Sequence, residues 1–158
     1  MIDKFEHFQK KCIKWILSEE ELSYGIDEIY FKKCRQVNCL PLSLRFTLND
    51  LIFFHKIVNN IIPVSLPEYL TFFNGNTRLR MSHLDKLSLV CSLLPRGPSK
   101  TILDKSFFYR THTVWNSLPL ELREIESLTG FRSKLETYLW DSILKRDRSD
   151  EQSDLTVA

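Results

Sequence analysis

The sequence has few of the residues that interrupt regular backbone, with only four glycines and six prolines among 158 residues. Large apolar side chains are common by contrast, and eleven of them are phenylalanine. Because glycine and proline disrupt helix interiors, their scarcity favours long helices over a loop-rich or β-sandwich design. Four glycines are also too few to suggest a phosphate-binding glycine-rich loop.

Long apolar runs are missing as well. No stretch approaches the roughly 20 apolar residues that are needed to span a bilayer. The N-terminal residues lack the basic-then-apolar order of a secretory signal, since Asp3 and Glu6 interrupt them. Four cysteines without such a signal are typical of free thiols in a reducing compartment. We therefore expect an intracellular protein, in the cytoplasm or the nucleus, with no membrane partner.

The sequence also lacks the groups from which catalytic centres are built. Polymerases hold divalent metal ions on clustered carboxylates, and no two aspartates are adjacent here. Cys34 and Cys39 have no second close pair of ligands to complete a zinc site, so we expect buried thiols. The four histidines stand apart from one another and are expected to be surface or half-buried. We predict no enzymatic activity, no cofactor and no metal.

Apolar residues at helical spacing dominate what is present. In the first segment, Phe5, Phe8, Cys12 and Ile16 recur at steps of three and four residues, and lysines fill the other face, which predicts an amphipathic helix. The same spacing, together with capping residues, predicts further helices. The expected helical segments are 2–17, 23–34, 41–59, 106–116 and 131–143, with single turns at 67–70 and 120–126.

The middle of the chain has a different pattern. Asn74-Gly75-Asn76 is a turn signal, and polar and apolar residues alternate at 78–81 and 86–93, which suggests a hairpin or short extended segments. The expected fold is mainly α. It is a compact helical domain of about five helices with a loop-rich or short β-hairpin insertion at about 74–105. The domain spans 1–145, and a disordered acidic and polar tail follows at 146–158.

Charge is distributed unevenly along the chain, although the formal net charge is only +2. Basic residues exceed acidic ones between residues 61 and 111, where aromatic residues are interleaved with them. Basic side chains can neutralise phosphates, and aromatic rings can stack on unpaired bases. The candidate nucleic-acid-binding residues are Arg78, Arg80, Arg96, Lys100, Lys105 and Arg110, beside Phe107, Phe108 and Tyr109.

The aromatic residues have a second interpretation. Phe108 and Trp115 lie on one face of a predicted helix, and large aromatic residues at helical spacing usually fill a core. We favour the core interpretation by about three to one. The arginines can also belong to a solvated loop without any ligand.

An ordered set of short motifs gives the sequence its most specific feature. Trp115-Asn116-Ser117-Leu118-Pro119 ends an aromatic and basic helix, and a Ser-Leu-x-x-Phe-x-x-Lys-Leu pattern opens the next one. In order and spacing the set resembles the extreme C-terminal region of the polymerase polyproteins of non-LTR, LINE-like retrotransposons, from about Phe8 to Leu144. The stretches that carry the resemblance are 14–17, 22–24, 40–45, 49–54, 58–59, 106–119 and 127–135.

The resemblance implies a role in the family of RNA-directed DNA polymerases. In such polyproteins this region follows the palm and thumb of the reverse transcriptase, and it is usually attributed to template or target nucleic-acid handling. It implies partners that are RNA or DNA, or the rest of the polyprotein. Two departures are visible: Arg45 stands alone where relatives often carry paired basic residues, and there is no C-terminal zinc knuckle.

Three hypotheses from different classes follow. The first, which we favour, is a catalytically empty C-terminal fragment of a non-LTR reverse transcriptase with at most an accessory nucleic-acid-binding role. The second is a helical protein-interaction module without nucleic-acid binding. The third is an unrecognised enzyme, which is disfavoured because the sequence has no nucleophile, metal or cofactor pattern.

Overall fold

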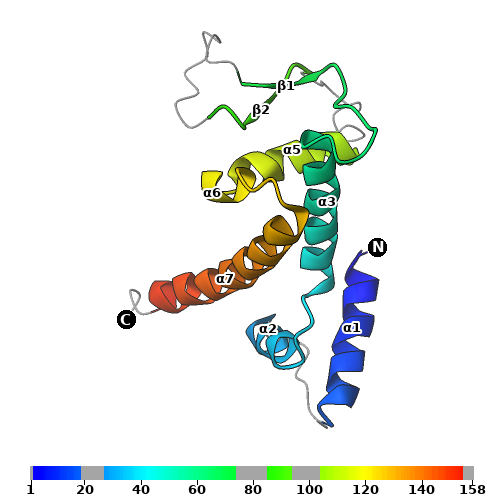
Figure 1. The fold of residues 1–158 in the computed structure, drawn as a ribbon. Helices are drawn as coiled ribbons and strands as arrows, with labels where there is room; N and C mark the ends of the chain where they lie inside the picture. Colours follow the sequence, from blue (N-terminus) through cyan, green and yellow to red (C-terminus); the bar gives the residue numbers. More distant parts are fainter. Residues whose placement is uncertain (1, 19–26, 74–84, 94–103, 155–158) are drawn as a thin grey trace. The chain divides into compact units, whose positions relative to one another are not determined.

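The computed structural model describes residues 2–18, 27–73, 85–93 and 104–154. This part of the chain is mainly helical and has a small antiparallel hairpin in the middle (Figure 1), which confirms the predicted fold class. The helices are α1 (Ile2–Ile16), α2 (Asp27–Gln36), α3 (Leu42–Val58), α5 (Phe107–Ser117), α6 (Leu120–Arg123) and α7 (Leu128–Asp154), and the strands are β1 (Leu70–Phe72) and β2 (Leu89–Cys91).

Two helices end at asparagines that adopt left-handed backbone conformations. Asn38 follows α2 with a φ of 50°, and Asn60 follows α3 with a φ of 54°. Asparagine tolerates this conformation better than most residues because its short polar side chain can hydrogen-bond locally. After α3, the N–H of Ile61 donates to the carbonyl of Lys56 at 2.8 Å, which satisfies a carbonyl that the helix itself leaves open. Helix α3 therefore ends within one residue of the predicted boundary at 59.

The hairpin differs in part from the prediction. Strand β2 lies within the alternating segment at 86–93, but the segment at 78–81 lies outside the described residues. The partner of β2 is β1, with Leu70 opposite Cys91 and Phe72 opposite Leu89. A turn closed by the N–H of Leu70 on the carbonyl of Pro67, at 2.9 Å, leads into β1. A single hydrogen-bonded turn therefore lies at 67–70, where one turn of helix was expected, and β1 begins at its last residue.

The last helix is longer than the sequence indicates. Phe131, Leu135 and Leu139 are buried on one face, as their four-residue spacing predicts. The helix then continues to Asp154, past the boundary at 145 where a disordered tail was expected. Adding a residue to an existing helix costs far less than nucleating a new one, so a polar segment can extend a helix that has no apolar pattern of its own. Residues 155–158 lie outside the described part.

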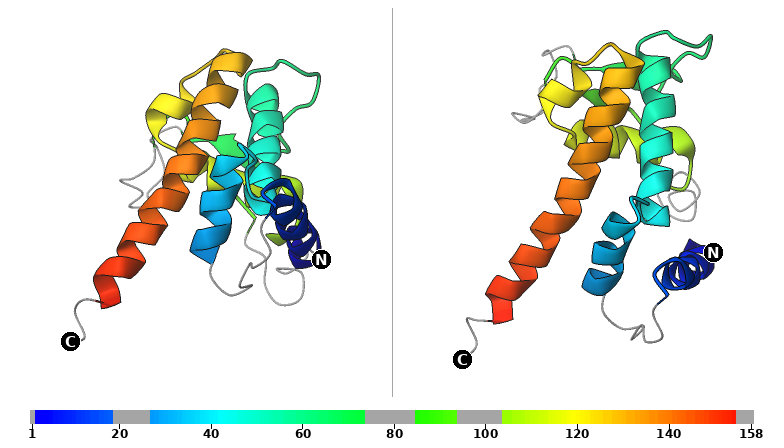
Figure 2. Two further views of the ribbon diagram at one scale, coloured as in Figure 1. Left: turned by 90° about the horizontal axis from the view of Figure 1, so that it is seen from below. Right: turned by 60° about the horizontal axis from the view of Figure 1, so that its bottom comes forward.

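The chain divides into two compact units, residues 1–48 with 136–158 and residues 49–135. The single domain predicted over 1–145 stays a prediction. In the first unit, α1 and α2 lie side by side (Figure 2). Its apolar cluster consists of Ile13, Tyr30 and Cys34 together with Leu17, Phe31, Val37 and Trp140.

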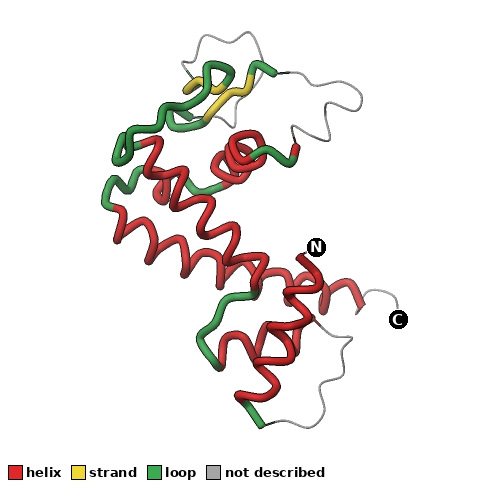
Figure 3. Tube along the Cα trace, turned by 90° about the vertical axis from the view of Figure 1, so that its right-hand side faces the viewer, coloured by secondary structure: helices red, strands yellow, loops and turns green. Residues whose placement is uncertain are grey.

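The second unit is built around aromatic residues. The ring of Trp115 in α5 lies 5.5 Å from that of Phe54 in α3 and 5.9 Å from that of Phe131 in α7, measured between centroids. The hairpin lies over α5, as Figure 3 shows. Residues from α3, α5, β2 and the start of α7 therefore share one core. Its fully buried members include Leu51, Phe54, His55, Leu89, Thr111, Trp115, Phe131 and Leu135.

Candidate functional site

The predicted nucleic-acid-binding residues fall into two groups. Arg78 and Arg80 lie in 74–84, and Arg96 and Lys100 lie in 94–103, so all four are outside the described residues. Lys105 and Arg110 are exposed near the start of α5. The structure therefore describes two of the six candidates.

Both of the undescribed basic segments adjoin the same hairpin. Residues 74–84 belong to the connection between β1 and β2, and residues 94–103 to the connection between β2 and α5. The N–H of Phe73 donates to the carbonyl of Ser88 at 2.8 Å, and the N–H of Ser92 donates to the carbonyl of Tyr69 at 2.9 Å. These bonds fix the backbone close to where each segment begins. The four undescribed candidate residues thus belong to two segments that both adjoin the hairpin of the second unit.

Arg110 is held by contacts within the protein. Its guanidinium donates to the carboxylate of Asp50 from Nε at 3.1 Å and from Nη2 at 2.6 Å, and to the carbonyl of Lys105 at 3.2 Å. It also lies over the ring of Phe107, 5.9 Å from the centroid. An exposed pair of this kind contributes little to stability, but it orients the guanidinium and balances its charge. Arg110 is consequently a weaker candidate for a phosphate contact than Lys105.

The neighbouring aromatic residues pack within the unit. Phe107 lies 5.4 Å from Phe53 in an edge-on arrangement and 5.2 Å from Phe108. Trp115 has no exposed surface. The core interpretation of Trp115 is confirmed, and its ring cannot stack on a base while the unit is folded.

The Trp-Asn-x-Leu-Pro stretch fastens the hairpin to α5. The indole N–H of Trp115 donates to the carbonyl of Leu87 at 3.1 Å. The side-chain amide of Asn116 accepts from the N–H of Leu89 at 2.8 Å and donates to its carbonyl at 2.7 Å, as a neighbouring strand would. The N–H of Leu118 closes the helix on the carbonyl of Trp115 at 3.1 Å. Sequence spacing predicted the buried tryptophan, but nothing in it indicated that Asn116 pairs with β2.

A buried ion pair connects α6 to the approach to β2. Arg123 donates to Asp85 from Nη1 at 3.0 Å and from Nη2 at 2.6 Å, to the hydroxyl of Ser88 at 3.0 Å, and to the carbonyl of Leu118 at 3.1 Å. The side chain of Arg123 is only 4% exposed. Sequence reasoning missed this cluster because its members are far apart along the chain. The hydrogen-bond donors of Arg123 and the acceptors around it satisfy one another, as expected of a buried polar cluster that stabilises the fold.

His55 departs from the expected surface or half-buried histidine. It is fully buried, and its ring stacks on that of Phe131 with centroids 4.2 Å apart. Nε2 lies 2.6 Å from the carbonyl oxygen of Ile125, so Nε2 carries the proton and donates. Nδ1 has no hydrogen-bond partner. Burial lowers the pKa of His55, because a charged imidazole there would lose its hydration.

This environment predicts a pH-dependent stability. Unfolded His55 gains a proton below its ordinary pKa of 6.5, whereas folded His55 does so only at lower pH. The contribution of His55 to the free energy of unfolding should therefore be complete above pH 6.5. It should decrease as the pH falls from 6.5 through the folded pKa, by at most about 1.4 kcal/mol per pH unit. Urea unfolding from pH 8 to pH 5 measures this. His55→Gln keeps a donor for Ile125 and should flatten the profile; equal slopes in both proteins would contradict the assignment.

A hydrogen-bonded cluster lies at the start of α3 in the first unit. Glu6 accepts from the N–H groups of Leu42 and Ser43, both at 3.1 Å, and from the hydroxyl of Tyr30. A carboxylate there satisfies helix N–H groups and matches the helix dipole. Burial is the main reason that the pKa of the Cys34 thiol rises to about 11, and it also raises the pKa of Tyr30. Cys34 is therefore a buried thiol, as predicted, and not an activated nucleophile.

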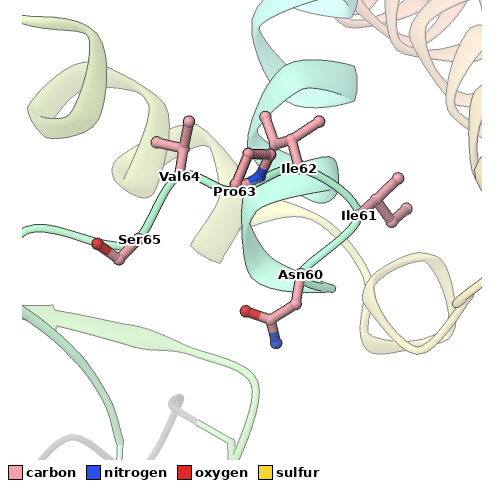
Figure 4. A pocket seen from close by; sticks show the side chains of 6 residues that line it. All are labelled: Asn60, Ile61, Ile62, Pro63, Val64 and Ser65. Carbon is pink, nitrogen blue, oxygen red and sulfur yellow. The ribbon is translucent and has the colours of Figure 1, made fainter.

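A surface hollow of about 510 Å³ lies beside the segment that follows α3 (Figure 4). Its lining residues run consecutively from Asn60 to Ser65 and include no ionisable side chain. Catalytic sites normally combine titratable groups from several elements. This hollow does not have that composition.

No protein-family model, curated protein or solved structure matches the chain. Among the described residues, no group of three or more His, Cys, Asp or Glu side chains is arranged to hold a metal ion. The helices in the same part of the chain are too short or too polar for any of them to cross a bilayer.

Proposed function

We propose that this chain is a catalytically empty helical module of the type that follows the polymerase in non-LTR retrotransposon polyproteins, with an accessory role in binding RNA or DNA. The observation that carries the proposal is the structural use of the Trp-Asn-x-Leu-Pro stretch. Trp115, Asn116 and Leu118 each have a specific backbone partner in the second unit. Such constraints favour a motif that encodes a particular fold over a chance string of residues.

The nucleic-acid role is supported by the placement of the basic segments. Residues 74–84 and 94–103 each contain two candidate residues and adjoin the hairpin that Asn116 fastens to α5. Lys105 is exposed at the end of the second segment. Phosphate contacts need only cations within reach of the strand, so basic residues in two segments that adjoin one hairpin suit sequence-independent binding.

A fluorescence anisotropy titration with labelled single-stranded RNA and DNA tests this role. We expect binding that weakens as salt rises, because each neutralised phosphate releases counterions. Replacing Arg78 and Arg80 by glutamine should reduce the slope of log K against log salt by roughly 1.4, or about 0.7 per lost contact. Arg132→Gln with Lys134→Gln removes the same charge from exposed positions of α7 and should leave the slope unchanged.

The possible outcomes separate the hypotheses. Binding of RNA and DNA that is no tighter than binding of an uncharged peptide nucleic acid, and that does not depend on salt, would contradict the nucleic-acid role and favour the helical protein-interaction module.

Extension of a primed RNA template in the presence of Mg²⁺ tests the statement that the chain is catalytically empty. We expect none from this chain, and metal-dependent extension would overturn the statement that it is catalytically empty.

A further inference from the structure

Helix α1 presents a stripe of large apolar side chains to solvent. Phe5, Phe8, Trp15 and Ile16 are 57%, 66%, 84% and 67% exposed, and Cys12 lies between them, partly exposed. Steps of three and four residues place these side chains along one side of the helix, over about 16 Å. No charged residue interrupts the stripe, because charged positions of α1 fall outside this arc.

The orientation of α1 is fixed by contacts on another face. Gln9 and Ile13 are buried, and the amide of Gln9 donates to the carbonyl of Leu40 at 3.0 Å. Glu6 accepts hydrogen bonds from the N–H groups that begin α3. The periodicity of the sequence indicated the apolar stripe correctly, but the adjoining face, with Ile13 and the polar Glu6 and Gln9, makes the contacts within the unit. The apolar stripe is thereby left at the surface.

Lysines border this stripe on one side. Lys4 and Lys11 are exposed, and helical geometry places both beside Trp15, on the flank away from Gln9 and Ile13. The charge is segregated from the apolar side chains and not interleaved with them. An apolar strip with a basic border complements a partner that is apolar inside and negatively charged at its edge.

We propose that α1 binds an anionic lipid surface and lies in its plane. Phe5, Phe8, Trp15 and Ile16 enter the boundary between headgroups and acyl chains, and Lys4 and Lys11 meet the headgroup phosphates and carboxylates. Aromatic and aliphatic side chains on one face and lysines beside them are the features of helices that bind in this way.

Other occupants fit the surface less well. A stable protein interface uses roughly 20–30 residues a side and is enriched in arginine and depleted in lysine, whereas this stripe is short and bordered by lysine alone. A second copy of the chain, bound through the same stripe, would likewise have too few residues in contact for a stable interface. Phe5, Phe8 and Trp15 could also stack on the bases of a single strand, but Cys12 and Ile16 add apolar surface that stacking does not use and acyl chains do, so oligonucleotide binding is an outcome of the test.

The expectation of no membrane partner depended on the lack of a bilayer-spanning segment. A helix that lies on a membrane is a different structure, because only one face leaves water and the backbone bonds stay within the helix. The proposal does not depend on nucleic-acid binding, which involves residues of the other unit.

Flotation of the purified full chain with unilamellar vesicles tests the proposal. One set is phosphatidylcholine, and the other contains about one third phosphatidylserine. Each lysine near an anionic surface strengthens binding about fivefold, so Lys4 and Lys11 together should make the partition coefficient roughly twenty-five-fold larger on the anionic vesicles. The emission of Trp15 should shift to the blue on binding, and the Trp15→Phe variant should lose most of that shift.

Matched variants identify the surface responsible. Phe8→Ser with Trp15→Ser should weaken binding at least roughly tenfold, and Lys4→Gln with Lys11→Gln should remove most of the preference for anionic vesicles. Phe46→Ser, at another exposed aromatic of the same unit, should change neither. Far-UV circular dichroism checks that each variant is folded.

Several results would overturn the proposal. Equal binding to both kinds of vesicle would remove the role of the lysines. Vesicle binding that survives Phe8→Ser with Trp15→Ser would place the contact elsewhere. If no vesicle binding occurs and the same variants instead abolish self-association or oligonucleotide binding, the stripe belongs to that partner.

Discussion

Trp115→Ala should reduce the free energy of unfolding of the second unit by about 3–5 kcal/mol. Trp115 is fully buried, so its removal leaves a cavity among Phe54, His55 and Phe131. The carbonyl of Leu87 also loses the indole donor that lies 3.1 Å away. Since a small domain is stable by only about 5–15 kcal/mol, a loss of this size can unfold much of the unit at room temperature.

The same substitution at another tryptophan is a matched control. Trp15 is 84% exposed, so Trp15→Ala should cost no more than about 0.5 kcal/mol. Urea unfolding followed by far-UV circular dichroism compares the two variants without relying on tryptophan emission. A loss below about 1 kcal/mol for Trp115→Ala would mean that Trp115 faces solvent or a partner, contrary to this structure.

The helices were predictable because local periodicity and capping determine them. The apolar spacing of α3 and α7 and the proline before α3 do not depend on distant residues. The buried Trp115 follows from the same reasoning. Periodicity does not show, however, which face of a helix packs against the rest of the protein. In α1 the burial of Ile13 and the hydrogen bonds of Glu6 and Gln9 determine the covered face, and their partners lie far along the chain.

The candidate site was less predictable for a related reason. A basic residue in a sequence looks like a phosphate ligand whether or not a carboxylate lies beside it in the fold. Asp50 is distant from Arg110 in sequence but holds its guanidinium at 2.6 Å. Asn116 and Arg123 likewise acquire their roles only when the hairpin reaches them. Such polar contacts are directional, and composition or spacing does not encode them.

Asp85→Asn should be nearly as damaging as the loss of Trp115, at about 3–5 kcal/mol. In the native protein the N–H of Leu87 lies 2.9 Å from Oδ1 of Asp85, and asparagine keeps an oxygen for this bond. The substitution removes the negative charge that pairs with Arg123. The side chain of Arg123 is 4% exposed and that of Asp85 is 26% exposed. A cation left without its partner in that position cannot be rehydrated, whereas a stranded Asp85 can reach water.

A double-mutant cycle isolates this interaction. Arg123→Met preserves much of the apolar stem, and combined with Asp85→Asn it should cost less than the sum of the single changes, since no buried charge remains. Asp50→Asn, the same substitution in the exposed pair with Arg110, should cost less than about 1 kcal/mol. Additive losses in urea unfolding would show that Arg123 and Asp85 contribute independently. A coupling of several kcal/mol would instead identify their ion pair as the contact that joins α6 to the approach of β2.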